Sequence, residues 1–296
     1  MSKATRLRQQ SAREKIAAQR AAARRAEIRR RALITAGSVI AVIAIVVAFV
    51  VIKVSSNNSP SSKGSGSGGV SGTALPASVI KNITTVPAST LNAVGTGSVL
   101  SFNPAPISAV SNTPLKSGGK PEMLYIGAEF CPYCAAERWG MAVALSRFGT
   151  FSPLHGIHSS STDTDPNTPT LTFYKSTYTS KYLVFTPVEN ETVSHALLQT
   201  PTPAQQALWN KYNPNAYPFV DIGNKYVIKA PSYDPQALAG LTWAQVAADL
   251  HNPSSAPAQG ADGTANLITA AICKVTGGQP GSVCKSAGVV KASGSL

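Results

Sequence analysis

The sequence predicts an α/β fold in which helices flank a central mixed sheet, with insertions, and one transmembrane helix that precedes it. Three observations lead to this prediction. Residues 32–52 contain no charged side chain. Further along, the apolar run 122–128 leads into Cys-Pro-Tyr-Cys at 131–134, where a helix-like pattern begins. Pro218 then precedes two short runs of β-forming residues joined by Gly-Asn.

Charge is distributed unevenly along the 296 residues, whose formal net charge is +13. Residues 1–31 hold eleven Lys or Arg and two Glu, whereas residues 55–296 hold 14 basic and 11 acidic side chains. Charged residues make up 13% of the chain, about half of the roughly 25% usual in soluble domains. This composition excludes a long charged disordered protein and a coiled coil. The basic head lacks interleaved aromatic residues, so we expect no nucleic-acid partner.

The uncharged stretch 32–52 predicts a membrane span, because a helix of that length covers about 31 Å, the thickness of a bilayer core. A buried core helix is a weaker alternative, since such helices are seldom uniformly apolar for this long. A cleaved signal peptide is the stronger alternative, but its apolar region usually has about 7–15 residues and needs a far shorter basic region. We therefore expect an uncleaved signal anchor.

The flanking charges predict the orientation. By the positive-inside rule, residues 1–31 form a basic cytoplasmic head that suits the anionic surface of the lipid bilayer, and residues 32–54 form the transmembrane signal anchor. Residues 55–73 are rich in Gly and Ser and predict a flexible linker. Residues 74–296 then form an extracytoplasmic domain of a single-pass cell-membrane protein.

The segment around 131–134 predicts redox chemistry. A buried strand that runs into Cys-x-x-Cys at the start of a helix is the thioredoxin-type arrangement. Cys131 would lie at the helix N-terminus, where the helix dipole stabilises a thiolate, and Pro132 suits the first helical turn. Cys134 follows Tyr133 and comes round beside Cys131. We expect Cys131 to be the exposed attacking thiol and Cys134 the buried resolving thiol.

Other uses of the Cys-x-x-Cys motif fit less well. A c-type haem site needs His after the second Cys, where this chain has Ala135. A zinc site needs a second ligand pair at short spacing, and Cys273 and Cys284 have ten residues between them. The four histidines form no evident ligand set, and a purely structural disulfide across this motif is strained. The sequence therefore predicts no cofactor and no metal.

The second part of the predicted site is Tyr217-Pro218, directly before the β-type runs 219–222 and 225–229. Thioredoxin-like folds place a cis-proline loop opposite the active cysteines, and an aromatic-Pro bond is among the more cis-prone. We expect a cis bond that turns the Tyr217 backbone toward the sulfurs, where an extended substrate could pair with it. The alternative is an ordinary trans proline where a strand begins.

The remaining pattern predicts further elements of a thioredoxin-like domain. These are strands at 171–174 and 182–185, helices at 205–211 and after the Thr242 capping box, a last helix capped by Thr264, and a surface loop at 151–170. Outside the cytoplasm Cys273 and Cys284 would be oxidised. We favour a structural disulfide that tethers the tail; the alternative is a shuttle that exchanges electrons with Cys131 and Cys134.

Three blocks carry a family resemblance: FCPYCAAERWG, YPFVDIGNKYVI and ICKVTGGQPGSVC. They resemble a thioredoxin-like family of membrane-anchored proteins known as domain of unknown function 929, over about residues 75–296. The resemblance implies a thioredoxin fold and, through the wider superfamily, thiol–disulfide exchange with Cys131 as nucleophile, Cys134 as resolving thiol and Pro218 as the cis-proline. The tetrad is also similar to that of glutaredoxins, but glutathione from the cytoplasm would not be at hand outside.

The sequence departs from this pattern at Tyr125. Many thioredoxins carry a buried Asp at this position, six residues before the first Cys, where it can remove the proton of the resolving Cys. This chain has Tyr125 there, so that route of proton removal is missing. Glu129 or Glu137 could take over the role. We expect both of them to be exposed surface charges instead.

These observations predict a membrane-anchored thiol–disulfide oxidoreductase, an enzyme that acts on the thiols or disulfides of exported proteins. Oxidase or isomerase activity is favoured over reductase activity, because a reductase outside needs electrons delivered through the membrane. A membrane redox partner would reset the cysteine pair. The alternatives are a non-catalytic thioredoxin-like binding module of the cell envelope and a copper metallochaperone, against which the lack of a nearby His or Met cluster argues.

Overall fold

The computed structural model describes residues 72–296. The predicted basic head, the signal anchor 32–54 and the linker up to residue 71 lie outside these residues. Among the described helices, none combines the length and apolarity that crossing a bilayer requires. Thr73, which the sequence assigns to the end of the linker, forms strand β1 (Thr73–Ala74) and pairs antiparallel with Gly156.

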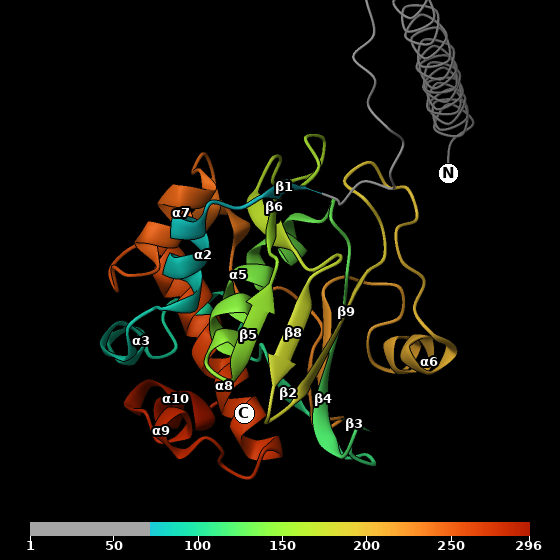
Figure 1. Cartoon of the computed structure of the whole chain (residues 1–296), viewed down its shortest axis with the longest axis vertical. Coiled ribbons are helices and arrows are strands. Elements are labelled where there is room, and N and C mark those ends of the chain that lie inside the picture. Colours follow the sequence, from blue (N-terminus) through green and yellow to red (C-terminus); the bar gives the residue numbers. More distant parts are fainter. Residues whose placement is uncertain (1–71) are drawn as a thin grey trace, which may run out of the picture. The chain divides into compact units, whose positions relative to one another are not determined.

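A six-stranded mixed sheet forms the centre of the described part (Figure 1). Its order is β2-β11-β10-β4-β3, and β9 runs parallel beside β4, whereas the other pairs are antiparallel. The strands are β2 (Ser108–Ala109), β3 (Lys116–Ser117), β4 (Lys120–Gly127), β9 (Val184–Glu189), β10 (Phe219–Ile222) and β11 (Tyr226–Ile228). Helices flank this sheet, so the predicted α/β class with a central mixed sheet is confirmed.

Strand β4 alternates between two cores, as a strand buried on both faces must. Met123 and Tyr125 belong to the larger core, with α5 (Pro132–Ser146) and α8 (Gly263–Val275). Leu124 and Ile126 belong to a smaller core on the other face, with Trp209 of α6 (Pro203–Tyr212). Further helical elements complete the fold: α2 (Ala77–Thr84), α3 (Ala88–Val94), α4 (Val99–Phe102), η1 (Pro235–Leu238), α7 (Trp243–Asp249), η2 (Ala258–Asp262), α9 (Gly281–Cys284) and α10 (Ala287–Ser293).

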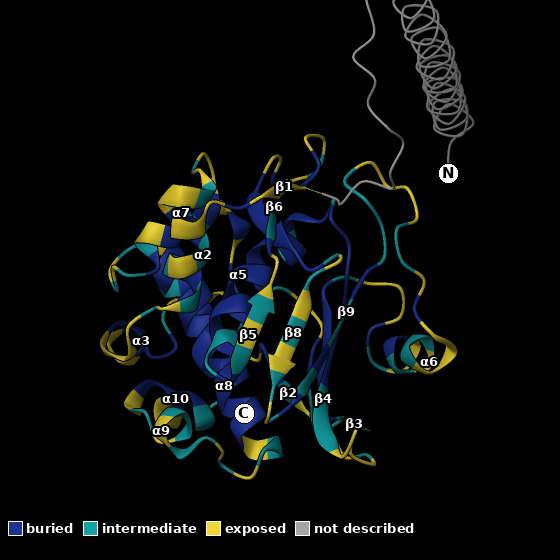
Figure 2. Cartoon of the chain, in the orientation of Figure 1, coloured by how far each residue is buried: buried dark blue, intermediate teal, exposed yellow. Residues whose placement is uncertain are grey.

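Helix α5 is buried almost all round, as Figure 2 shows. The sequence pattern predicts a helix with one apolar side, and the structure differs because α8 and η2 cover its outer face. Gly140 permits this approach: a Cβ there would lie 2.6 Å from Cγ2 of Thr264 in α8. The polar side chains Glu137 and Arg138 of α5 are both buried.

Local sequence signals set several boundaries as predicted. Thr242 and Gln245 form a capping box at the start of α7, and Thr202 forms another with Gln205 at α6. The Gly-Asn turn between β10 and β11 has positive φ at both residues, 65° at Gly223 and 53° at Asn224. Three residues, Gly223, Asn224 and Lys225, join the paired ends Ile222 and Tyr226. Two successive positive φ angles are typical of a tight hairpin turn, so the predicted strand pair is confirmed.

Two local predictions are wrong. The predicted surface loop 151–170 contains strand β6 (His155–His158) and the ends of β5 (Gly149–Ser152) and β7 (Pro169–Thr172). These strands pair in two small sheets, β1-β6-β7 and β5-β8 (Thr177–Ser180), whose distant partners the local composition does not reveal. Thr264 does not cap α8, because the π-helical turn η2 continues directly into that helix, and the Thr264 side chain is buried against Gly140 of α5. Nor is α8 the last helix.

Cys273 and Cys284 form the predicted disulfide, with their Cα atoms 5.6 Å apart. The bond joins α8 to α9, and α10 then packs back on α8.

Replacing both of these cysteines by serine is expected to destabilise the domain by about 3 kcal/mol, the chain-entropy value for a loop of this length. Urea unfolding followed by far-UV circular dichroism measures the change. The wild-type protein under a strong reductant is the matched control and should approach the variant. Equal midpoints for variant and oxidised wild type would contradict a structural role.

Candidate active site

The Cys-x-x-Cys motif lies at the start of α5, directly after the connection from β4. Cys131 is the N-cap residue of α5 and Pro132 is its first residue, as the sequence predicts. The backbone N–H of Cys134 donates to Sγ of Cys131 over 3.1 Å. Both thiols are free, and only 5% of Cys131 and none of Cys134 is exposed. The expectation of an exposed Cys131 is therefore wrong, because Phe130, Tyr133 and Tyr217 pack against the cluster that contains it.

The surroundings give the two thiols opposite acidities. Burial by itself raises the pKa of the Cys131 thiol, but hydrogen bonds from the side chain and backbone of Cys134, aided by Arg138, outweigh it. The net pKa of Cys131 lies below its ordinary value of 9.0. For Cys134, burial and the hydrogen bond to Cys131 raise the pKa well above that value. The pair thus holds one thiol ready to ionise and one that keeps its proton.

The predicted proline loop meets the cysteines. The Tyr217-Pro218 peptide is cis, as predicted. The Tyr217 ring packs against the cluster formed by Ala128, Cys131 and Cys134, where Tyr133 also packs. The hydroxyl of Tyr217 donates to Glu191 over 3.1 Å. The amide of Asn213 donates to the Pro218 carbonyl over 3.1 Å and so holds the loop in place.

A rim of polar side chains that the sequence analysis missed lies beside this cluster. Phe130, directly before Cys131, packs against His195 with the two rings tilted by 30° and their centroids 3.9 Å apart. Its carbonyl accepts a hydrogen bond of 2.8 Å from the backbone of Ser160. These contacts border a cavity of about 440 Å³ lined by Glu129, Ser160, Ser161, Thr162, Thr192, Val193, Ser194 and His195. Most of this lining carries hydroxyl groups, and neither cysteine takes part in it.

Glu129 and Glu137 are fully buried, so the expectation of exposed surface charges is wrong. Glu129 accepts a hydrogen bond of 2.7 Å from the hydroxyl of Thr172. Glu137 accepts two, each of 3.0 Å, from the backbone N–H and the hydroxyl of Ser232. Burial raises the pKa of Glu137 to about 7. The carboxyl group of Glu137 is thus held in place by Ser232.

A buried ion pair lies one helical turn below Cys134, and the sequence analysis missed it as well. Arg138 donates through Nη2 to Glu189 over 2.6 Å and through Nε over 2.9 Å. The same Nη2 donates to the carbonyl of Ala128 over 2.8 Å. Neither side chain is exposed. The i, i+4 spacing indicates that Arg138 lies on the same side of α5 as Cys134, so the sequence could have shown the place of Arg138. No local pattern indicates Glu189, which lies 51 residues after Arg138.

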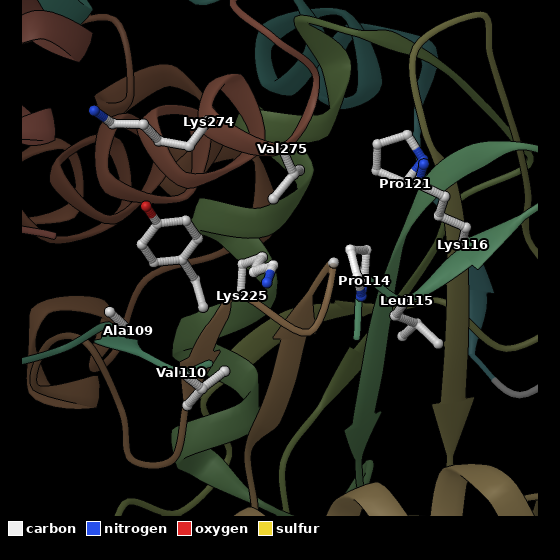
Figure 3. A pocket seen from close by; sticks show the side chains of 11 residues that line it. Ala109, Val110, Pro114, Leu115, Lys116, Pro121, Lys225, Lys274 and Val275 are labelled. Carbon is white, nitrogen blue, oxygen red and sulfur yellow. The ribbon is translucent and has the colours of Figure 1, made fainter. Parts of the chain in front are cut away.

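A second cavity, of about 490 Å³, lies at the other end of the sheet, beside the start of β4 and the β10–β11 turn (Figure 3). Lys116, Lys225 and Lys274 contribute to its lining, and none of its lining residues is acidic. Lys225 is already engaged, because its Nζ donates to the carbonyl of Asn112 over 2.7 Å. No cysteine lines this cavity, so it does not belong to the cysteine site. Across residues 72–296 no group of three or more His, Cys, Asp or Glu is placed to hold a metal ion.

The family model described as Domain of unknown function (DUF929) matches residues 106–274. The chain belongs to this family. The match confirms the predicted membership of this family over residues 106–274, a shorter range than the 75–296 expected from the sequence, and the matched region contains Cys131, Cys134, Tyr217 and Pro218. No curated protein and no solved structure matches the chain.

Proposed function

We propose that this protein is a thiol–disulfide oxidoreductase, a thioredoxin-like enzyme anchored in the cell membrane that acts on exported proteins. One observation carries the proposal: two free thiols share a helix N-terminus, and their surroundings shift their pKa values in opposite directions. A low thiol pKa provides the attacking thiolate, and the neighbouring thiol resolves the mixed disulfide. The uncharged stretch 32–52 and its basic flank support the membrane anchor.

The arrangement of elements supports a thioredoxin-like fold. The central strand β4 leads into the cysteine motif, β9 runs parallel beside it, and β10 runs antiparallel on its other side. The Tyr217-Pro218 segment enters β10 and meets the cysteines. This combination brings a potential client-binding backbone next to the reactive sulfur.

The exchange would proceed in two steps. A client thiolate attacks Sγ of Cys131 in the oxidised pair, forming a mixed disulfide and expelling Cys134 as a thiolate. A second client thiolate then attacks the client sulfur and expels Cys131. The client gains a disulfide, the protein ends with two thiols, and a membrane redox partner returns the pair to the disulfide. This direction is favoured because reductase action outside needs electrons carried through the membrane.

The reduction potential of the Cys131–Cys134 pair tests the proposal. The purified chain is equilibrated in graded thiol–disulfide buffers, and free thiols are counted by alkylation and mass spectrometry. We expect the pair to open and close reversibly between about −120 and −270 mV, nearer the oxidising end. The Cys273–Cys284 disulfide stays closed and serves as an internal reference. A pair that never exchanges would contradict the proposal.

The low exposure of Cys131 favours a second candidate, a non-catalytic thioredoxin-like binding module. In that case clients would bind through the hydroxyl-lined cavity beside Phe130. Client binding would then survive the loss of Cys131, which separates the two candidates.

A further inference from the structure

The Arg138–Glu189 pair is an unusual feature to find under a cysteine motif. Both side chains are fully buried, and burying an ion pair usually brings little net stability compared with well-packed apolar residues. The pair must therefore be explained by its position as well as by its hydrogen bonds. Arg138 follows Cys134 by one helical turn, and its guanidinium reaches the carbonyl of Ala128, which packs against both cysteines.

One buried nitrogen of the Arg138 guanidinium, Nη1, donates no hydrogen bond. Nε and Nη2 of Arg138 are engaged by Glu189 and Ala128, whereas Nη1 is buried without a hydrogen-bond partner. The hydroxyl of Tyr125 is likewise buried and unpartnered, and the guanidinium lies 5.8 Å from the centroid of the Tyr125 ring. Buried donors without partners are rare and call for an explanation. Here a negative charge that forms only during the reaction would supply it.

We propose that Arg138 is a positioning residue for the exchange reaction: its buried guanidinium stabilises the thiolate of Cys134 whenever that sulfur carries charge. This inference rests on the proposed function and deepens it. Cys134 is a thiolate when a client expels it and again when it attacks Cys131. Stabilising that state favours both directions of the step, as microscopic reversibility requires.

The other groups around Cys134 do not provide this charge. Tyr125 on β4 and Tyr217 in the proline loop stay neutral, because burial raises the pKa of each phenol. Glu189 on β9 is an acidic side chain and is held by Arg138. The Cys131 thiolate repels a second negative charge on Cys134, whereas Arg138 lowers the pKa of Cys134 against the effect of burial. Arg138 therefore favours the Cys134 thiolate through its positive charge, whereas a nearby carboxylate would favour it by accepting the proton of the thiol.

The step balances as follows. In a mixed disulfide between Cys131 and a small thiol, the Cys134 thiol gives up its proton to the solvent, and the resulting thiolate attacks Sγ of Cys131. The Cys131–Cys134 bond forms, the bond to the small thiol breaks, and that thiol leaves as a thiolate. No further oxidant or reductant is needed, because the mixed disulfide already holds the oxidising equivalent.

The test follows release of thionitrobenzoate from its mixed disulfide with Cys131 in the full chain, across pH 5–10. The release rate reports the thiolate fraction of Cys134. An opposite charge within a few ångströms lowers a pKa by about 1–3 units. The double variant Arg138→Met/Glu189→Gln, which removes both charges, should therefore release thionitrobenzoate about tenfold or more slowly at pH 7. Its profile should shift to higher pH by one unit or more.

Single variants test the direction of the shift in the pH profile of thionitrobenzoate release. Glu189→Gln alone leaves Arg138 uncompensated and should shift the profile to lower pH, a change that a merely structural role would not produce. Arg138→Lys keeps the charge and should stay within a few-fold of wild type. Cys273→Ser/Cys284→Ser, which removes the disulfide between α8 and α9, is the control and should change the rate less than about twofold.

The outcomes separate the two proposals. Release from wild type with the opposite shifts supports the role of Arg138. Wild-type release with an unshifted profile in the double variant and in Glu189→Gln overturns it and leaves the proposed function intact. If wild type never releases thionitrobenzoate, the proposed function fails and this inference falls with it.

Discussion

Replacing Cys131 by serine is expected to reduce exchange with a small disulfide to the rate of the reaction without protein. A serine hydroxyl does not ionise at neutral pH and cannot form a disulfide, whereas the Cys131 thiol has a pKa below its ordinary value. Stopped-flow measurement of thionitrobenzoate release from its symmetrical disulfide checks this. Retained exchange in Cys131→Ser would contradict the assignment of the nucleophile.

Cys134→Ser provides the matched variant, because it keeps the nucleophile and removes the resolving thiol. We expect one equivalent of mixed disulfide to accumulate on Cys131, with turnover lost. Cys273→Ser/Cys284→Ser is the control and should keep the wild-type exchange rate. A loss of exchange in that control would favour the electron-shuttle alternative for the second pair.

The stability of the domain is expected to fall as pH rises from about 4 to 8. Asp262 is fully buried, and neither of its carboxyl oxygens has a hydrogen-bond partner. Burial raises its pKa to about 8, although Arg147 opposes the shift. An acid whose pKa is raised by folding binds more protons in the folded state, so its stabilising contribution is full below the unfolded pKa and is lost as pH rises through the folded pKa.

The magnitude follows from the size of the shift. A change of this size corresponds to on the order of 5 kcal/mol for Asp262 between the two ends of the pH range. Glu137, with its pKa raised by burial to about 7, acts in the same direction over a narrower range. Urea unfolding at pH 5, 7 and 9 measures the effect. Equal stability of wild type at pH 5 and pH 9 would contradict it.

Asp262→Asn isolates the contribution of one carboxyl group. Asparagine has nearly the same shape and no charge, so the variant should lose most of the decline between pH 7 and pH 9 and be the more stable protein at pH 9. Glu137→Gln is the matched control. It should flatten the curve mainly below pH 7 and leave the decline between pH 7 and pH 9 in place.

The elements nearest to the cysteines could be predicted because their causes are local. A Pro after a Cys at a helix start, a Gly-Asn pair with two positive φ angles, and a Thr with Gln three residues later each act within a few residues. Short-range steric and hydrogen-bonding rules govern such features. The pairing of Cys273 with Cys284 belongs to the same class, since only eleven positions separate them.

The sequence by itself therefore determined that a strand leads through the cysteines into a helix and that a hairpin follows Pro218. It also determined the disulfide between Cys273 and Cys284 and the family to which the chain belongs. The tertiary structure alone decided which charges are buried. Glu129 and Glu137 look like surface carboxylates in the sequence, but strands and loops distant in the chain cover them. Arg138 and Glu189 meet across 51 residues because β9 pairs with β4 beside α5. Burial depends on all neighbours at once, and so the burial of these charged groups could not be inferred from spacing.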